Sequence, residues 1–189
     1  MSQQPVTAPA RGPRLSADAL KVKIRNIPDF PKPGILFYDI TTLLGDADGF
    51  RGVIDALVEP FEQAGITTVV GIESRGFILG GAVADRLGAG FVPVRKPGKL
   101  PGKTVRESYA LEYGTDVLEM HEGALAAGDR VLIVDDVIAT GGTARATASL
   151  VRALGAKVHA LAFLIELGFL NGRQHLPGEQ VYSVITYES

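Results

Sequence analysis

The sequence predicts an α/β fold in which a mostly parallel central sheet is flanked by helices. An apolar run without alternation, typical of a strand buried on both faces, occurs at residues 131–135, and strands are also predicted at 67–72 and 157–165. Segments with helical spacing at 77–87 and 143–154 alternate with these strands. The chain has 189 residues, 46% of them hydrophobic, which is enough for one domain with a substantial core.

The N-terminal elements are predicted from caps, prolines and apolar spacing. Ser16 is a good N-cap for a helix over residues 16–26. Three prolines then interrupt regular structure before a short β-rich segment at 35–44. Apolar residues at helical spacing predict a helix over 47–64, which Gly65 ends.

Alternating strand and helix patterns continue to the end of the chain. Residues 95–103 carry four cations among glycines and prolines, with little apolar surface to anchor them, so we expect a mobile loop. Weak alternation around Tyr113-Gly114 predicts a hairpin over 104–120. The strands expected in this part lie at 67–72, 91–94, 131–135, 157–165 and 181–187, and the helices at 77–87 and 143–154.

Composition limits the class of protein. Residues 1–15 contain three prolines and two arginines but no apolar stretch, which predicts a disordered tail before a single domain at 16–189 and excludes a secretory signal. No apolar run approaches the ~18 residues of a membrane span. The net charge of −2 provides no general attraction to nucleic acid or membrane, and the absence of cysteine excludes disulfides. Together these features favour a cytoplasmic protein.

Residues 131–143 are the most informative segment for function. An apolar strand ends in Asp135 and Asp136, and a small polar turn at 140–143 then begins a helix. The first N–H groups of a helix favour anions, and ligands of parallel sheets gather at the carboxyl ends of the strands. Two acids beside a phosphate-binding turn suit a ligand that carries both a phosphate and ribose hydroxyls.

Three other interpretations of the glycines and acids fit the sequence less well. An acid pair at a strand end can simply be solvated, but the flanking strand and helix patterns disfavour this here. No Gly-x-Gly-x-x-Gly follows a strand, which argues against a dinucleotide site. Gly102-Lys103-Thr104 ends like a Walker A motif, but Pro97 stands where its first glycine is required.

The pattern at 131–143 resembles the 5-phosphoribosyl-1-pyrophosphate (PRPP) site of the type I phosphoribosyltransferases. Four further segments resemble the adenine-specific members of that family, and the likeness runs from about residue 20 to the C-terminus: residues 30–40, 73–77, 95–102 and 108–114. The resemblance implies the family fold, with a small hood segment and a mobile loop. It also implies a purine-salvage glycosyltransferase that converts adenine and PRPP to AMP and pyrophosphate, with Mg²⁺ as cofactor and a homodimer as the typical assembly.

The resemblance also assigns roles to residues on the PRPP side. Asp135 and Asp136 would hold the ribose hydroxyls and, indirectly or through PRPP, the magnesium ion. The 5′-phosphate would lie on Ala139, Thr140, Gly141, Gly142 and Thr143. Pyrophosphate would be bound by Glu73, Ser74, Arg75, Arg95, Lys96 and Lys99, with Glu73 and Ser74 acting through backbone N–H groups.

Further roles concern the base. Glu112 is expected to handle the adenine proton as the new bond forms. The family reads the edge of adenine through backbone groups and packs aliphatic side chains on the ring. The matching residues are Leu36, Phe37, Tyr38 and Leu167. Some relatives have arginine at the position of Tyr38, so the role of that side chain stays open.

Two alternative functions are also compatible with a PRPP site. The first is a phosphoribosyltransferase for another purine, such as xanthine, hypoxanthine or guanine. Enzymes for six-oxopurines generally offer a lysine to the exocyclic oxygen, whereas strand 157–165 has Lys157 only at its start. The second is a PRPP-binding regulator that acts on nucleic acid, which would need a basic face or an added DNA-binding segment.

Overall fold

A computed structural model describes residues 14–110 and 114–188 of the chain. The chain divides into two compact units, Met1–Gly52 and Val53–Ser189, and each is described by itself. Apart from its last two residues, the tail expected at 1–15 lies outside the described residues. Within the described part of the chain, every helix is too short or too polar to cross a membrane.

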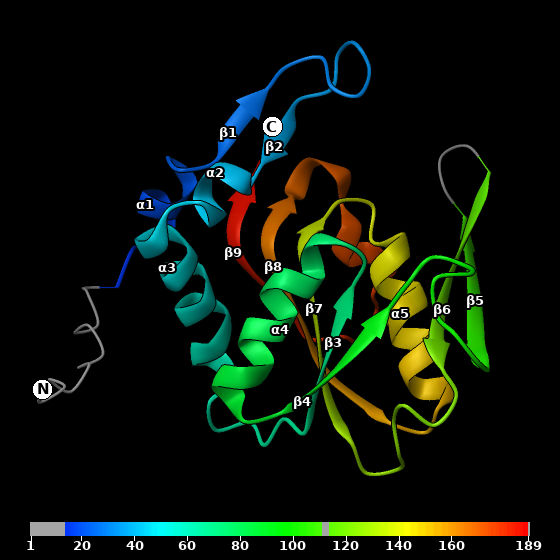
Figure 1. Ribbon diagram of the computed structural model, residues 1–189. Helices are drawn as coiled ribbons and strands as arrows, with labels where there is room; N and C mark the ends of the chain where they lie inside the picture. Colours follow the sequence, from blue (N-terminus) through cyan, green and yellow to red (C-terminus); the bar gives the residue numbers. More distant parts are fainter. Residues whose placement is uncertain (1–13, 111–113, 189) are drawn as a thin grey trace, which may run out of the picture. The chain divides into compact units, whose positions relative to one another are not determined.

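The N-terminal unit begins with helix α1, Ala17–Lys21. The predicted cap is confirmed, because Ser16 Oγ accepts a hydrogen bond from the Ala19 N–H at 3.2 Å. The predicted extension to residue 26 is wrong, because the chain leaves the helix after five residues and forms strand β1 at Arg25–Ile27 (Figure 1).

Strand β1 is formed by pairing with a distant segment. It runs antiparallel to β2, Phe37–Asp39, within the β-rich stretch predicted from the sequence. Arg25 lies opposite Asp39 and donates to its carboxylate from Nε at 3.1 Å. Asp39 Oδ1 also accepts from the Thr41 N–H and hydroxyl, which begins helix α2, Thr41–Leu44. This non-local pairing outweighs the local helical tendency.

Helix α3, Ala47–Val58, contains the boundary between the two units. It is shorter than the predicted 47–64. A 3₁₀ turn at Glu59–Phe61 follows it, because Pro60 has no N–H to donate to an α-helical hydrogen bond. Gly65 has a φ of 63°, a left-handed conformation that suits the predicted end of the helical region.

The C-terminal unit contains the predicted parallel sheet. Its five strands lie in the order β4-β3-β7-β8-β9, and every neighbouring pair is parallel (Figure 1). All five predicted strands are present, and β7 and β8 extend three and two residues further than expected. The strands are β3 (Thr68–Ile72), β4 (Gly90–Val94), β7 (Arg130–Ile138), β8 (Lys157–Leu167) and β9 (Val181–Tyr187).

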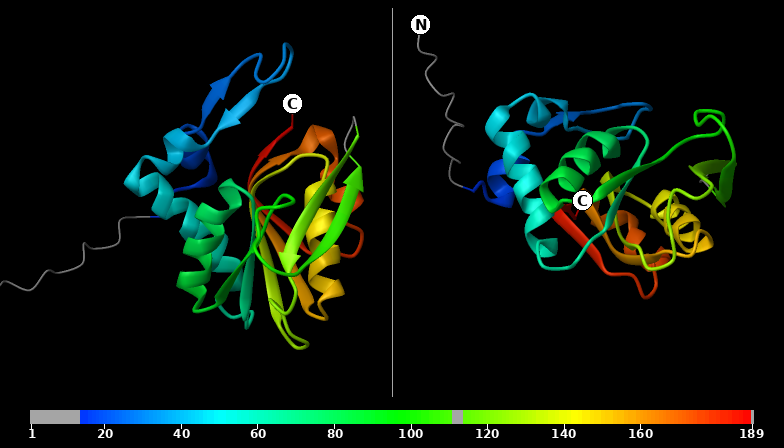
Figure 2. Two further views of the ribbon diagram at one scale, coloured as in Figure 1. Left: turned by 45° about the vertical axis from the view of Figure 1, so that its right-hand side comes forward. Right: turned by 60° about the horizontal axis from the view of Figure 1, so that its bottom comes forward.

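Helices cover both faces of this sheet, as predicted. Helix α4, Arg75–Leu87, lies on one face, and α5, Gly142–Ala153, lies on the other (Figure 2). The predicted hairpin is formed by β5, Thr104–Ala110, and β6, Thr115–His121, on the same side as α5. The fold class predicted from the sequence is therefore confirmed, and residues 111–113 between these strands lie outside the described residues.

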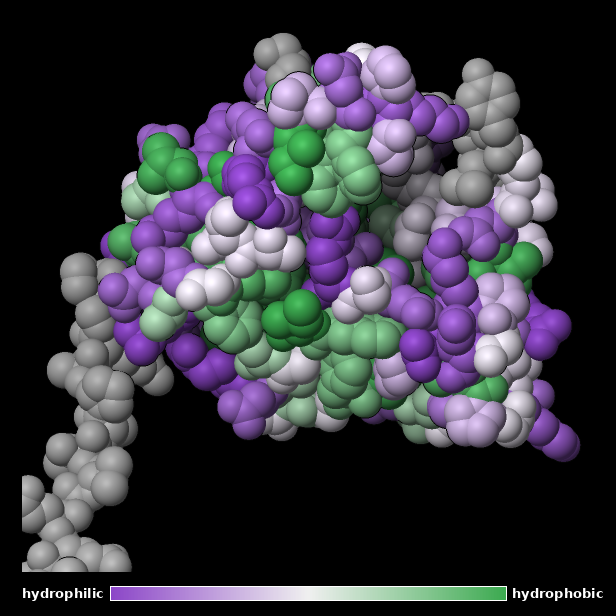
Figure 3. All heavy atoms as spheres, turned by 45° about the horizontal axis from the view of Figure 1, so that its top comes forward, coloured by the Kyte–Doolittle hydropathy of each residue, from purple (hydrophilic) through white to green (hydrophobic). Residues whose placement is uncertain are grey.

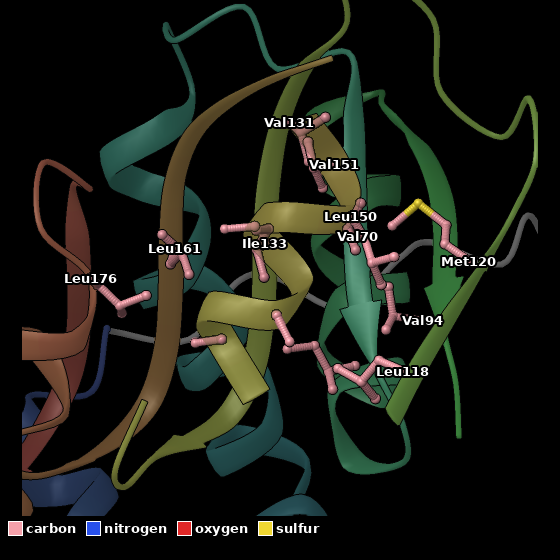
Figure 4. Packing of buried hydrophobic residues seen from close by; sticks show 14 of the residues in the cluster. Val70, Val94, Leu118, Met120, Val131, Ile133, Leu150, Val151, Leu161 and Leu176 are labelled. Atoms are coloured by element: carbon pink, nitrogen blue, oxygen red, sulfur yellow. The ribbon is translucent and has the colours of Figure 1, made fainter. Parts of the chain in front are cut away.

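A hydrophobic core joins α5 and the hairpin to the sheet. Leu150 and Val151 of α5 are at most 1% exposed and point toward the strands (Figure 4). The same cluster contains sheet and hairpin residues that are at most 2% exposed: Val70, Val94, Leu118, Met120, Val131, Ile133 and Leu161. Burial of this kind contributes about 1.5–3 kcal/mol for each large side chain, so the core holds the strand ends in place.

Candidate functional site

A pocket of about 290 Å³ lies at the carboxyl edge of the sheet in the C-terminal unit. Figure 3 looks onto this edge of the molecule and shows hydrophilic side chains gathered there. The pocket is lined by every residue from 135 to 144, by Glu73, Arg75 and Lys96, and by Tyr109, Leu118 and Phe163. The acid pair, the phosphate turn and part of the predicted pyrophosphate site therefore surround one cavity.

The acid pair is nearly buried where β7 approaches the edge of the sheet. Asp135 is 9% exposed and Asp136 is 5% exposed. The Asp136 N–H donates to Asp135 Oδ1 at 2.9 Å, and Arg75 Nε lies 2.8 Å from Asp136 Oδ2. Burial, and then the charge of Asp136, raise the pKa of Asp135 well above its usual range. A hydroxyl donor or a cation that entered the pocket would favour the ionised form of Asp135.

Close packing places Arg75 beside the acid pair. Arg75 is the first residue of α4, and Gly76 follows it. A Cβ at Gly76 would lie 2.7 Å from Asp135 Oδ1 and 3.0 Å from the Val134 carbonyl oxygen. Only glycine allows the first turn of α4 to approach β7 this closely, and the approach brings the guanidinium to Asp136.

The predicted phosphate turn leads directly into α5. Gly141 has a φ of 81° and is the N-cap, and its carbonyl accepts the first helical hydrogen bond from the Arg145 N–H at 2.9 Å. The first N–H groups of a helix have no partner within the helix and attract anions. All five residues from Ala139 to Thr143 line the same pocket as the acid pair, and their contact with the 5′-phosphate stays a prediction.

Glu73 anchors the loop that follows β4. The peptide bond between Glu73 and Ser74 is cis. The Glu73 carboxylate accepts hydrogen bonds from Arg95 Nη2 at 3.1 Å and from the Lys96 N–H at 2.9 Å. Burial raises the pKa of Glu73, but the hydrogen bonds from Arg95 and Lys96 outweigh it, and the net pKa is lowered. The Glu73 side chain is therefore an internal partner of the loop.

The three loop cations that are predicted to bind pyrophosphate lie in different surroundings. Lys96 lines the pocket, and its Nζ is 3.5 Å from Asp116 Oδ2. Arg95 is directed to Glu73, to the Lys99 carbonyl oxygen at 3.1 Å, and to the ring of Phe77 at 5.8 Å. Arg95 and Lys99 are outside the pocket lining in the described part of the chain. Their contact with pyrophosphate stays a prediction.

Tyr109 is a pocket residue to which the sequence analysis assigned no role. It is 6% exposed, and its hydroxyl lies 3.3 Å from Asp116 Oδ2 and 3.4 Å from Thr143 Oγ1. Burial raises its pKa. Side chains alternate between the two faces of a strand, and Arg106 and Ser108 of β5 are exposed. This alternation is the signal that could have predicted Tyr109 on the inner face.

The predicted base-binding residues fall in both units. Leu36 is 43% exposed, whereas Tyr38 is 8% exposed, and burial raises the pKa of Tyr38. Phe37 packs edge-on against Phe30 with 5.1 Å between ring centroids. These residues belong to the N-terminal unit, and Leu167 ends β8 in the C-terminal unit. Their common role stays a prediction, as does that of Glu112, which lies outside the described residues.

Comparisons with known proteins identify relatives that match most of the chain. The family model of the phosphoribosyl transferase domain matches residues 42–186. The chain is 60% identical to an adenine phosphoribosyltransferase from Solibacter usitatus over 169 residues, which are 89% of this chain and 98% of that protein.

Solved structures show the same likeness. The adenine phosphoribosyltransferase of Rhodothermus marinus has a TM-score of 0.87 and 59% identity, with 90% of this chain and 98% of that chain covered. The enzyme of Saccharomyces cerevisiae has a TM-score of 0.84 and 44% identity, with 89% and 97% covered. The yeast enzyme was crystallised with adenine and an imino-altritol bisphosphate.

Proposed function

The chain belongs to the adenine phosphoribosyltransferase family, and we propose that it transfers the 5-phosphoribosyl group of PRPP to adenine, which forms AMP and releases pyrophosphate. Such a reaction recovers a free purine as a nucleotide. The observation that carries the proposal is the single pocket in which an acid pair, a glycine-rich helix start and Arg75 lie together.

The pocket suits each part of PRPP. The 5′-phosphate would bind the N–H groups at residues 139–143, and the ribose hydroxyls would donate to Asp135 and Asp136. Pyrophosphate would lie toward Arg75 and Lys96, which already line the cavity. Binding at three points would orient C1 of the sugar toward the incoming base.

The reaction needs charge stabilisation more than a strong nucleophile from the protein. As adenine N9 displaces pyrophosphate from C1, positive charge develops on the sugar and negative charge on the leaving group. Asp135 and Asp136 would stabilise the first charge, and Arg75 and Lys96 would stabilise the second. Glu112 would accept or redirect the adenine proton, a role supported by the resemblance of residues 108–114 to the family.

Adenine recognition would depend mainly on backbone groups. We assign the base edge to residues 36–38 of the N-terminal unit, with Leu36 packed on the ring. The exposure of Leu36 supports this role, because an aliphatic side chain that is 43% exposed in the N-terminal unit is available to a ligand. The buried Tyr38 side chain is a less suitable contact, so its backbone would contribute more than its ring.

The donor set fits magnesium that arrives with PRPP. Among the described residues there is no group of three or more potential metal ligands from side chains. Mg²⁺ commonly uses one or two carboxylates together with water and substrate phosphates. Asp135 and Asp136 can supply such carboxylate oxygens, and the bound ion would neutralise charge on pyrophosphate.

Assembly and location are part of the same proposal. Ile78 of α4 is 49% exposed and Phe91 of the edge strand β4 is 37% exposed, and exposed apolar side chains of this kind support a homodimer that would cover them. Light scattering after size exclusion would measure the assembly. A cytoplasmic location agrees with the substrates, because PRPP and AMP are charged phosphates that membranes retain. Neither nucleic acid nor a membrane is an expected partner.

The decisive experiment is a turnover assay with each natural purine offered separately. Purified protein, PRPP and Mg²⁺ should form AMP and pyrophosphate with adenine. Hypoxanthine should be much poorer, because its carbonyl would face a backbone acceptor, and a matched polar site can discriminate by about 10⁴-fold. Comparable kcat/KM values for both bases would contradict the adenine assignment. PRPP binding without any turnover would favour a regulator.

A further inference from the structure

A short segment after β8 packs against the outside of the phosphate turn. We call residues 168–176 the strap; it contains 3₁₀ turns at Gly168–Leu170 and Gly172–His175. A Cβ at Gly172 would lie 2.3 Å from the Ala139 carbonyl oxygen, and a Cβ at Gly141 would lie 2.4 Å from the Gly172 carbonyl oxygen. The backbones of the strap and the turn are therefore in direct contact, beside the start of α5 (Figure 2).

The strap is fixed to the sheet by an ion pair. Arg173 donates from Nε and Nη2 to the two carboxylate oxygens of Glu166, each at 2.6 Å. Arg173 Nη1 also donates to the Val181 carbonyl oxygen at 2.7 Å. Glu166 is 9% exposed and lies opposite Ile138, the last residue of β7 before the turn. A bidentate pair of this kind restrains both position and orientation, so the strap is a rigid support.

His175 provides a specific contact from the strap to the turn. Its Nδ1 lies 2.7 Å from the Thr140 carbonyl oxygen. A carbonyl oxygen can only accept, so Nδ1 carries the proton and donates it. The Thr140–Gly141 peptide is trans, and in a trans peptide the C=O and N–H point in opposite directions. Holding the carbonyl toward the strap therefore directs the Gly141 N–H away from it.

We propose that His175 is a positioning residue for the 5′-phosphate, acting through the Thr140 carbonyl without touching the ligand. The hydrogen bond favours the turn conformation in which the Gly141 N–H faces the pocket. A phosphate can then bind donors that are already oriented, with no cost of reorganisation. The identification of the ligand as a 5′-phosphate rests on the proposed function, whereas the restraint on the turn is a property of the free protein.

The test compares three variants of the full-length protein. His175→Ala removes the donor, His175→Asn retains an amide N–H near the position of Nδ1, and Gln174→Ala changes an exposed neighbour in the same 3₁₀ turn. Two quantities are measured: amide hydrogen exchange at residues 139–143 without ligand, and affinity for ribose 5-phosphate and for pyrophosphate by calorimetry.

His175→Ala should exchange faster at the turn and bind ribose 5-phosphate about 3–10-fold more weakly, as expected for one lost neutral hydrogen bond. Pyrophosphate affinity should stay as in the wild type, because its proposed ligands lie on other elements. His175→Asn should restore most of the ribose 5-phosphate affinity, and Gln174→Ala should match the wild type in both measurements.

Three results would overturn the inference. The first is wild-type exchange and ribose 5-phosphate affinity in His175→Ala. The second is an equal loss of affinity for both ligands, which would indicate general destabilisation. The third is a failure of His175→Asn to restore binding in a folded protein. If the wild type bound neither ribose 5-phosphate nor PRPP, the proposed function itself would fail, and hydrogen exchange would still decide whether His175 restrains the turn.

Discussion

The phosphate turn and the pyrophosphate loop are both assigned to anions, yet they are built in opposite ways. The phosphate turn, residues 139–143, offers backbone N–H groups at a helix start and is packed against the strap through Gly141 and Gly172. The pyrophosphate loop, residues 95–103, offers long cationic side chains, and carboxylates of the protein already occupy several of its donors.

Internal carboxylates hold the pyrophosphate loop in its present position. Glu73 accepts from the Lys96 N–H, and Glu119 Oε2 accepts from the Gly98 N–H at 3.1 Å. The Glu119 side chain is 1% exposed, and its other oxygen lies 2.7 Å from Arg106 Nε. A ligand that bound this loop would have to replace or rearrange such contacts, whereas the phosphate turn needs no rearrangement.

The difference matches the proposed chemistry. The 5′-phosphate keeps its charge throughout the reaction, so a permanent site on fixed dipoles suits it. Pyrophosphate gains charge as it leaves and must then be released, so side chains with internal partners suit it better. One pocket thus combines a rigid half with a half that can exchange its hydrogen bonds.

Gly141→Ala should distort the phosphate turn and reduce turnover more than any other variant proposed below. The new Cβ would lie 2.4 Å from the Gly172 carbonyl oxygen, and alanine is strained at a φ of 81°. We expect kcat/KM for PRPP to fall by about 10²–10³-fold, the range seen when aligned donors are lost. The measurement is steady-state turnover with adenine in excess.

Gly98→Ala is the matched control in the loop. Gly98 also has a positive φ of 75°, but a Cβ there would meet nothing within 4 Å. Its kcat/KM should change by no more than a few-fold, because a loop can relax. Equal losses in the two variants would show that the turn is no more restrained than the loop.

Arg75→Gln should weaken the binding of pyrophosphate much more than the binding of ribose 5-phosphate. It removes the cation that lies 2.8 Å from Asp136 and lines the pocket. We expect pyrophosphate affinity to fall by about 10–100-fold, as a charge-assisted hydrogen bond contributes about 1.5–3 kcal/mol. Affinity for ribose 5-phosphate should fall much less. Arg86→Gln is the control on the same helix, since Arg86 pairs with Asp55 at 2.6 Å and lies outside the pocket lining.

Asp135→Asn should stabilise the free protein although it impairs turnover. Because burial and Asp136 raise the folded-state pKa of Asp135, the folded protein binds more protons than the unfolded chain at any pH between about 4 and that raised value. The free energy of unfolding of the wild type should therefore fall as pH rises through this window. Asparagine cannot titrate, so the variant should lack this decline and be more stable at neutral pH by about 1–3 kcal/mol.

Thermal unfolding of the wild type and Asp135→Asn from acid to neutral pH would measure this effect. Asp129→Asn is a control for a carboxylate outside the pocket. Parallel stability curves for the wild type and Asp135→Asn across the whole range would show that Asp135 is not destabilising in the free pocket.

Glu119→Gln should have the smallest effect and act on the pyrophosphate loop. Losing the charge weakens the contacts to Gly98 and Arg106, so proteolysis within 95–103 should be about 2–5-fold faster in the free protein, an effect of about 1 kcal/mol or less. PRPP with Mg²⁺ should protect the loop in both proteins. Unchanged cleavage rates in the presence of ligand would contradict the binding of pyrophosphate by this loop.

The sequence by itself was sufficient where the signal is local. All five strands of the sheet were predicted because each is a short segment rich in apolar and β-branched residues. Ser16 was identified as a cap because its contact lies only three residues along the chain. The acid pair and the phosphate turn were found for the same reason, since strand, acids, turn and helix follow one another without interruption at residues 131–143.

Only the tertiary structure decided which distant segments meet. It formed β1 from residues expected to be helical, because β2 lies beside them, and it placed Arg75 against Asp136, because Gly76 permits close packing. It also brought Tyr109 and the strap to the phosphate turn from opposite directions along the chain. These contacts depend on packing between elements far apart in sequence, and no local pattern of residue types encodes them.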